Sequence, residues 1–354
     1  MRNEYGPLHE IPRWRLFGIV LAVASTALVA ASLAAAPLEK PNVTVAVGGR
    51  SSLYYLPLTL AERLGYFKKE GLNVEVADFA GVSKALQAML GGSADITAGG
   101  FDHAIVMQAK GQKLQAFVLM VATPAISVGV SKSRMPAFHS LKDLKGMKIG
   151  VTAPGSSTHM VVNRLLSSVG LSADDVSIIG VGNGPTAAAA MRSGQIDAIS
   201  NVEPAISMLE SAGAITVVTE TLTEKGTRAV FGTPQLPAGC LYAKEEFIRS
   251  NPRTVQALTT AMVRTLKWLA KATDEDIVQT VPPEYLMGDR QLYLTALRKS
   301  RDTYSKDGMI PASGAQTLHE VLRAFDPSVK EATGLVVGQA YDNAFVQKAW
   351  QEVR

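Results

Sequence analysis

Small hydroxyl residues follow two short apolar runs of the chain, and each group comes just before a segment with helical periodicity. The groups are Ser51-Ser52 in the first run and Ser156-Ser157-Thr158 in the second. At a helix N-terminus the backbone N–H groups are unpaired and the helix dipole is positive, so an anion is favoured there, and hydroxyls add donors. Plain helix capping is the alternative for any one of these serines. Together they predict a site for a carboxylate, a sulfonate or a similar group that needs no arginine.

A second pair of loops has the same small-residue character. One contains Gly81 and Ser83, and the other contains Gly184 followed by Pro185 and Thr186. Small residues allow a ligand to approach the backbone closely. We therefore expect Gly81, Ser83 and Gly184 to contribute to the same site.

A third pair of loops differs in chemistry between its two members. One contains Gly100 and Asp102, and the other contains Asn201 and Glu203. The two carboxylates could accept hydrogen bonds from an ammonium group or from ring N–H groups of a heterocycle. Alternatively, Asp102 caps the helix that follows it and Glu203 accepts from backbone N–H groups.

Three further side chains are candidates for the site. Tyr54 follows the first serine pair and could stack on a planar ligand or pack in the core. Thr123 lies in the stretch between two apolar segments and is expected to contact the ligand. His159 follows Thr158 and could protonate when an anion binds, or could simply be a surface or capping histidine.

The elements that must position these residues recur along the chain. Three strand–loop–helix units repeat about 102–105 residues apart. In the closest pair, Ala88-Met89-x-x-Gly92-x-x-Asp95 matches Ala190-Met191-x-x-Gly194-x-x-Asp197. Three matches in the same order predict two lobes of one topology, each a parallel sheet with helices on both faces. Ligands bind such sheets beyond the carboxyl ends of the strands, so the loops would surround one cleft.

The length of 354 residues exceeds what a single core usually spans, which also favours two lobes. Two Pro-rich stretches, one containing Pro124 and one containing Pro234 and Pro237, are expected to be hinge crossings. We predict lobe 1 from residues 37–123 plus 238–354 and lobe 2 from residues 124–237, with a helical C-terminal part.

The N-terminal segment has the layout of a secretory signal peptide. Arg13 and Arg15 precede an uncharged stretch from Leu16 to Leu38, which ends in small residues suited to cleavage. We predict a signal peptide over 1–36 and a periplasmic location. An uncleaved membrane anchor is the alternative, because the stretch is long enough to span a bilayer.

Composition excludes several classes of function. The net charge of +4 is interspersed and forms no basic stripe, so nucleic acid is not an expected partner. The one cysteine, Cys240, lies in an apolar run and is interpreted as a core residue, and no intrachain disulfide or cysteine-based zinc site can form. The five histidines show no Ser-His-Asp or metal-ligand spacing, so we expect no catalytic residue, metal or cofactor.

Two strings of residues resemble a known family. They are Gly65-Tyr-Phe-Lys-Lys-Glu-Gly-Leu72 with the preceding Leu56-Pro-Leu58, and Leu141-Lys-Asp-Leu-Lys-Gly146. The chain over about residues 43–270 is similar to ABC-transporter solute-binding proteins of the nitrate/sulfonate/taurine group, which includes relatives that bind thiamine-precursor pyrimidines. The resemblance implies the two-lobed type II periplasmic-binding-protein fold, closure on a solute, and docking to a membrane permease with its ATPase.

The sequence thus predicts a monomeric, non-catalytic binding protein for a small organic anion that is sulfonate-, taurine- or carboxylate-like. A pyrimidine or other heterocycle remains an alternative, as does a membrane-anchored ligand-sensing domain. The expected contact residues are Ser51, Ser52, Tyr54, Gly81, Ser83, Gly100, Asp102, Thr123, Ser156, Ser157, Thr158, Gly184, Asn201 and Glu203.

Overall fold

The first sheet has the strand order β2-β1-β3-β10-β4 in a computed structural model that describes residues 37–353. Its strands are β1 (Asn42–Gly48), β2 (Asn73–Phe79), β3 (Ile96–Gly100), β4 (Leu114–Leu119) and β10 (Gly239–Lys244). The alternating apolar residues of β1 place Val45 and Val47 in the core, both fully buried. Helices α2 (Leu56–Arg63), α3 (Tyr66–Lys69), α4 (Val82–Leu90) and α5 (Asp102–Ala109) connect these strands. The predicted signal peptide lies outside the described residues.

The second sheet repeats this arrangement with the order β7-β6-β8-β5-β9. Its strands are β5 (Ile126–Ser131), β6 (Lys148–Val151), β7 (Ser177–Gly180), β8 (Ala198–Val202) and β9 (Ile215–Glu220). Its helices are α6 (Ser157–Ser168), α7 (Gly184–Arg192), α8 (Ala205–Ser211) and α9 (Glu224–Phe231). Apolar side chains of α7, α8, β8 and β9 form one core cluster, and those of α6, β5, β6 and β8 form another. Both sheets belong to one unit, Glu39–Arg354. The predicted two-lobed α/β fold is confirmed.

Each sheet is mixed rather than purely parallel. β1 pairs in parallel with β2 and β3, but β10 is antiparallel to β3 and β4, and in the second sheet β5 is antiparallel to β8 and β9. Both antiparallel strands come directly after the chain has crossed from the other sheet. The crossing delivers the chain to the carboxyl ends of the parallel strands, so the next strand must run away from that edge.

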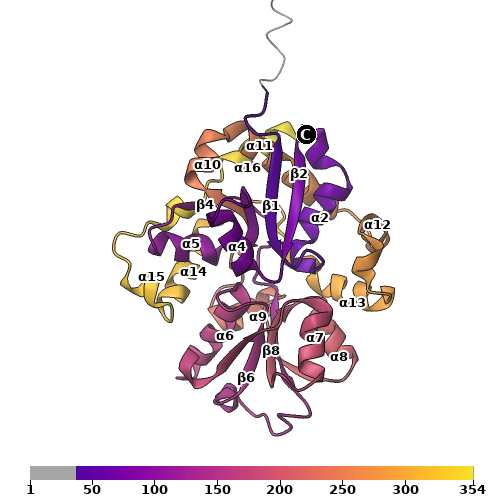
Figure 1. Cartoon of the computed structure of the whole chain (residues 1–354), viewed down its shortest axis with the longest axis vertical. Helices are drawn as coiled ribbons and strands as arrows, with labels where there is room; N and C mark the ends of the chain where they lie inside the picture. The colour runs from indigo at the N-terminus through magenta and orange to yellow at the C-terminus, as the bar shows by residue number, and fades with distance from the viewer. Residues whose placement is uncertain (1–36, 354) are drawn as a thin grey trace, which may run out of the picture. The chain divides into compact units, whose positions relative to one another are not determined.

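The chain after β10 is helical, as predicted. It contains α10 (Glu245–Ser250), α11 (Pro252–Leu269), α12 (Asp274–Thr280), α13 (Arg290–Ser300), α14 (Ala312–Arg323), α15 (Pro327–Glu331) and α16 (Ala344–Glu352). The predicted apolar face of α11 is core, since Val255, Leu258 and Met262 are fully buried. Helix α11 packs against α2, α3 and α16, so the C-terminal helices complete the first lobe (Figure 1). Within residues 37–353, no helix has both the length and the apolar character that a bilayer crossing requires.

Candidate functional site

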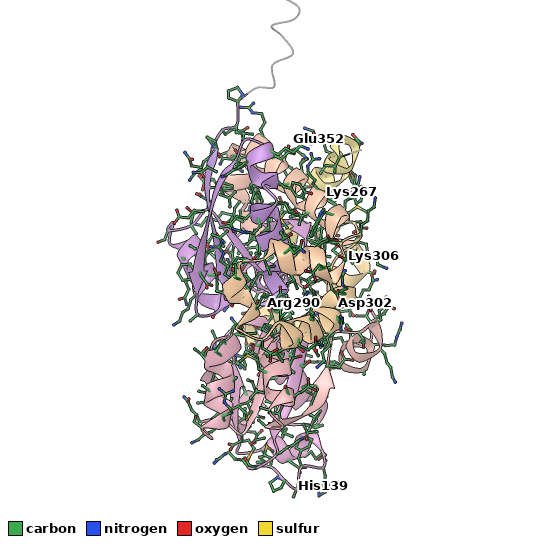
Figure 2. All side chains as sticks on the ribbon, turned by 90° about the vertical axis from the view of Figure 1, so that its right-hand side faces the viewer. His139, Lys267, Arg290, Asp302, Lys306 and Glu352 are labelled. Carbon is green, nitrogen blue, oxygen red and sulfur yellow. The ribbon has the colours of Figure 1, made fainter. Side chains whose placement is uncertain are left out.

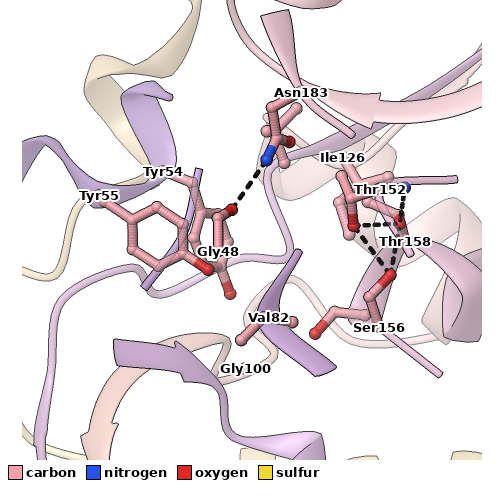
Figure 3. A pocket seen from close by; sticks show the side chains of 12 residues that line it. Gly48, Tyr54, Tyr55, Val82, Gly100, Ile126, Thr152, Ser156, Thr158 and Asn183 are labelled. Carbon is pink, nitrogen blue, oxygen red and sulfur yellow. Dashed lines mark hydrogen bonds between the residues drawn. The ribbon is translucent and has the colours of Figure 1, made fainter. Parts of the chain in front are cut away.

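A small cavity lies between the facing edges of the two sheets, and residues of both lobes line it (Figure 3). Its volume is about 30 Å³. The first lobe contributes Gly48, Tyr54, Tyr55, Val82 and Gly100, and the second contributes Ile126, Thr152, Ser156, Ser157, Thr158, Asn183 and Val202. All of these side chains are uncharged. We refer to this space as the interlobe cavity.

The second-lobe wall is built from hydroxyls at the N-terminus of α6. The Thr158 hydroxyl accepts from the backbone N–H of Thr152 at 3.0 Å, and it lies 2.7 Å from the hydroxyl of Ser156. The Thr152 hydroxyl donates to that of Ser156 at 2.9 Å. These bonds hold Ser156 as the first residue before α6, and its side chain does not cap the N–H groups of the first helical turn. The partial positive charge at the N-terminus of α6 would therefore favour an anion at this wall, although no cationic side chain lines it.

The first-lobe wall is aromatic. The rings of Tyr54 and Tyr55 are 5.2 Å apart between centroids and meet edge to face at 80°. Both side chains are buried, and the Tyr54 hydroxyl has no hydrogen-bond partner in the described part of the chain. Burial raises the pKa of Tyr54 well above its usual value, so its hydroxyl stays protonated and available as a donor. An acceptor on a bound solute would satisfy it.

Asn183 reaches across the cavity from the start of α7. Its Nδ2 donates to the carbonyl of Gly48 at 2.8 Å, and no partner is found for its Oδ1 among residues 37–353 (Figure 3). Glycine is required at position 48, because a Cβ there would lie 2.1 Å from the backbone N of Val82. The loops that follow β1 and β2 are therefore in close contact at Gly48.

Three more hydrogen bonds join the lobes around the cavity. The N–H of Leu53 donates to the carbonyl of Glu203 at 3.0 Å, and Ser157 Oγ donates to Asp102 Oδ1 at 2.8 Å. His103 Nε2 lies 3.2 Å from the carbonyl oxygen of Gly155. Because a carbonyl can only accept, Nε2 carries the proton, and Nδ1 then accepts from the hydroxyl of Tyr242 at 3.1 Å. The two lobes are closed on each other in this structure.

The structure brings five of the predicted residues together on the interlobe cavity. They are Tyr54, Gly100, Ser156, Ser157 and Thr158. Ser83 and Asp102 line a groove beside it, which Ser156 lines as well. Of the predicted set, these seven residues are therefore placed where one ligand could contact them.

The other predicted residues lie outside both spaces. Ser51 is exposed in a surface pocket with Arg50 and Glu62, and Thr123 lines a separate pocket near the crossings, together with the Asp302 and Lys306 labelled in Figure 2. Ser52, Gly81, Gly184, Asn201 and Glu203 make up the remainder. Asn201 is fully buried and its Nδ2 donates to the carbonyl of Gly182, which commits this side chain to the fold.

The two carboxylates expected near the cleft do not line the interlobe cavity. Asp102 is buried and accepts from Ser157. Glu203 is buried too, and its Oε2 accepts from the N–H of Ser207 at 2.9 Å, while Oε1 lies 3.8 Å from Lys299 Nζ. Burial raises the pKa of Glu203 against the opposing effects of Ser207 and Lys299. Both groups thus have partners within the protein.

Several residues of the cavity were missing from the prediction. Thr152 occupies the place in the second repeat that Gly48 has in the first, so the repeat itself contained a signal for both. Asn183 precedes the predicted Gly184 by one residue and could have been found as the helix N-cap. Val82, Ile126 and Val202 are apolar, and the sequence offered no signal that separates them from core residues.

Comparisons with known proteins agree with this architecture. Residues 52–276, more than half of the chain, match the family model described as NMT1/THI5 like. A solved structure of a protein from Bordetella bronchiseptica RB50 is 51% identical, with a TM-score of 0.87, and the match covers 90% of this chain and 99% of that one.

Two further matches carry descriptive names. The "Putative binding protein YtlA" of Bacillus subtilis (strain 168) is 24% identical over 316 residues, which cover 88% of this chain and 91% of that protein. The alkanesulfonate-binding protein SsuA from Xanthomonas axonopodis pv. citri, bound to MOPS, has the same fold at 18% identity and a TM-score of 0.67, covering 88% of this chain and 100% of that one.

Curated relatives also include enzymes. The 4-amino-5-hydroxymethyl-2-methylpyrimidine phosphate synthase of Schizosaccharomyces pombe is 26% identical over 162 residues, which cover 46% of this chain and 45% of that protein. The resemblance predicted from the sequence is confirmed at the level of the family. With a periplasmic-binding-protein fold and a family model that matches most of the region between β1 and α12, the chain belongs to the NMT1/THI5-like family.

Proposed function

We propose that the chain is the solute-binding component of an ABC importer and holds a small organic anion between its lobes without catalysis. The observation that carries this proposal is the interlobe cavity, in which the N-terminus of α6 and its hydroxyls face the tyrosine wall of the first lobe. The names of YtlA and SsuA, a putative binding protein and an alkanesulfonate-binding protein, support a binding role. The predicted partners are a membrane permease and its ATPase, and the predicted location is the periplasm.

The chemistry of the lining favours an anion over an amine. Neither Asp102 nor Glu203 lines the cavity, so no carboxylate is available there for an ammonium group. The free donors, by contrast, are the Tyr54 hydroxyl and the first-turn N–H groups of α6. A carboxylate or sulfonate would accept hydrogen bonds from these donors.

The volume of the cavity requires the lobes to move. About 30 Å³ leaves room for a water molecule or two, so even a small organic solute must enter with the lobes further apart. The interlobe bonds at the cavity lie at loops and helix starts, and away from it Lys299 of α13 pairs with Glu210 of α8. Opening by a hinge at the two crossings would break them without disturbing either sheet.

No step of covalent chemistry is proposed. Ser156 is bonded to Thr152 and Thr158 rather than to a histidine, so it has no base to activate it. His103 has both ring nitrogens bonded. A synthase activity like that named for the fungal relatives would need an acid or base at the cavity, and its lining residues include no His, Asp, Glu, Lys or Cys, only two tyrosines whose pKa is raised by burial.

The second candidate is the same role for a pyrimidine or other heterocycle. It is favoured by the aromatic wall, because a planar ring could stack on Tyr54 or Tyr55. The Asn183 Oδ1 without a partner could accept from a ring N–H. A pyrimidine that binds while every anion fails would favour this candidate.

The proposal can be tested with a thermal-shift screen followed by calorimetry. The compounds are alkanesulfonates, taurine, nitrate, aromatic carboxylates and pyrimidines. A ligand at 100 times its Kd stabilises the native state by about 2.7 kcal/mol, which raises Tm. Ser157→Leu should obstruct the cavity and abolish the shift. Ser168→Leu, at the other end of α6, is the matched control and should leave the shift unchanged. An organic anion that binds equally well to Ser157→Leu would contradict the proposed site.

A further inference from the structure

A second space, which we call the side groove, adjoins the interlobe cavity. It has a volume of about 440 Å³, much larger than the cavity. Helices α4 and α5 of the first lobe form one side of it, α6 of the second lobe forms another, and residues at the end of α14 close it. The groove is thus also formed by both lobes.

The cavity and the groove meet at Ser156, which lines both. Ser157 lines the cavity and Asp102 lines the groove, so the 2.8 Å hydrogen bond between Ser157 Oγ and Asp102 Oδ1 lies on the boundary between the two spaces. Gly100 leaves room for this bond, because a Cβ there would lie 2.1 Å from each of the two oxygens. Opening of the lobes would break the bond and join the two spaces.

Most of the wall area of the groove is apolar, although polar side chains such as Gln87 also line it. The apolar side chains include Leu86, Leu90, Val106, Met107, Met160 and Phe325. Two carboxylates and one exposed lysine, Lys110, also reach the groove. Asp102 accepts from Ser157, and Asp326 accepts from the backbone N–H groups of Ser328 and Val329. Since the carboxylates outnumber the lysine, an uncharged organic group fits this lining better than a second anionic group does.

Two polar atoms of residues that line the groove lack a hydrogen-bond partner within residues 37–353. The N–H of Gly155 donates to Nδ1 of His159 at 3.0 Å, so the proton of the neutral ring is on Nε2. This Nε2 is buried and has no acceptor within residues 37–353. One helical turn further along α6, the Oδ1 of Asn163 is likewise buried without a partner. A group that enters the groove would need an acceptor to satisfy His159.

We infer that the side groove receives the uncharged, apolar part of the solute whose anionic group lies in the interlobe cavity. This inference rests on the proposed function and narrows the solute. The solute is an organic anion with an apolar body of several carbons that carries a neutral acceptor such as an ether or carbonyl oxygen. Compact anions such as nitrate or taurine would leave the groove unfilled.

Calorimetry with straight-chain sulfonates, from methanesulfonate to octanesulfonate, tests the inference on the full chain. Each methylene that enters the groove should lower Kd about fourfold, which corresponds to 0.8 kcal/mol. Met107→Gln should remove much of the gain, weakening octanesulfonate about tenfold while methanesulfonate binds as before. Met107 is partly exposed, so the variant should fold. Met208→Gln, on a partly buried methionine of α8, is the matched control and should behave as the original chain.

The outcomes separate the inference from the proposed function. If methanesulfonate and octanesulfonate bind equally well, the inference is wrong and the proposed function stands. The inference also fails if the gain with chain length persists in Met107→Gln, because the tail then lies elsewhere. If no sulfonate of any length binds, and carboxylates of the same lengths also fail, both the inference and the organic-anion function are overturned.

Discussion

The two lobes have the same strand order, and their shared features are structural. Asp95 ends the Gly-x-x-Asp segment of the first lobe, where it accepts from the N–H of Thr44 at 3.0 Å and lies 2.5 Å from Lys40 Nζ. Asp197 ends the matching segment of the second. It holds the backbone of β6 in the same way through the N–H of Lys148, at 2.9 Å. In both lobes, the repeated aspartate thus ties the start of the middle strand of the sheet, β3 or β8, to the neighbouring strand, β1 or β6.

The lobes differ where they face each other. Gly48 of the first lobe corresponds to Thr152 of the second, and the buried Ser52 corresponds to Ser156. In the second lobe the hydroxyls bond to one another, whereas Ser52 Oγ and Tyr54 OH of the first lobe have no partner in the described region. The comparison suggests that the second lobe presents a preformed polar wall and that the polar groups of the first lobe are satisfied when a solute is bound.

The largest effect is expected for Gly48→Ala, which tests why the repeat has glycine in one lobe and threonine in the other. The new Cβ would lie 2.1 Å from the backbone N of Val82, and this neighbour cannot move without shifting α4. We expect a loss of about 3 kcal/mol in the free energy of unfolding, measured by chemical denaturation. Thr152→Ala at the matching position should cost less, because it removes side-chain atoms and forces no clash. Equal losses in both variants would contradict this explanation of the glycine.

The repeated aspartates, Asp95 and Asp197, should also contribute unequally to stability, which sharpens the comparison between the lobes. Burial acts to raise the pKa of Asp197, but the N–H of Lys148 and the guanidinium of Arg134 outweigh it and hold the pKa below its usual value. Asp197→Ala should cost about 2 kcal/mol in the free energy of unfolding, and Asp95→Ala less, because Asp95 is more exposed.

The contribution of Asp197 depends on pH. Because the folded-state pKa is lowered, it is complete above the unfolded value of 3.8 and lost as the pH falls through the folded-state pKa. Asp197→Asn keeps an acceptor for Lys148 and is the control. Denaturation at neutral pH and at pH near 3 should therefore give a smaller difference between the aspartate and alanine forms in acid.

A third contrast compares one hydroxyl from each wall. Thr158→Val leaves the N–H of Thr152 buried without its acceptor, so about 1–2 kcal/mol of stability should be lost. Tyr54→Phe removes a hydroxyl that has no partner in the described residues, so stability should hold or rise slightly. If the solute accepts from Tyr54, however, Tyr54→Phe should weaken binding several-fold. Melting curves with and without the solute separate the two effects, and a clear loss of stability in Tyr54→Phe would contradict the comparison.

The sequence predicted the scaffold better than the site. The alternating and helical patterns of apolar residues, together with the internal repeat, were enough to predict two lobes of one topology. Both patterns reflect which residues are buried. The site was harder to predict because each loop ends near the cleft while only some of its side chains point into the cavity. Ser156 and Ser157 do, but of the serine pair in the first lobe Ser51 is exposed and Ser52 is buried without lining the cavity. A one-residue difference in loop geometry decides this, and the sequence does not show it.

The antiparallel strands were not foreseen for a related reason. β5 and β10 have the same apolar composition as the parallel strands, and pattern alone does not give direction. Asp102 was predicted as a ligand contact from its position after β3. The structure shows that it also bonds to Ser157 of the other lobe, a contact between residues far apart in the sequence that no local signal could indicate.

The smallest effect concerns His159, which belongs to the second lobe and has no equivalent in the first. Burial lowers its pKa below the usual 6.5, so the folded state binds its proton less readily than the unfolded chain does. The contribution of the neutral His159 to stability should therefore be fully present above the unfolded pKa of about 6.5, and the protein should lose stability as the pH falls below that value. His159→Gln should flatten the change in Tm between pH 7 and pH 5.5. The matched control is His139→Gln, on the exposed histidine at the outer end of the second lobe (Figure 2), which should leave the slope unchanged. A slope that is the same in all three proteins would mean that His159 is solvated in solution, and its Nε2 would then need no acceptor from a solute.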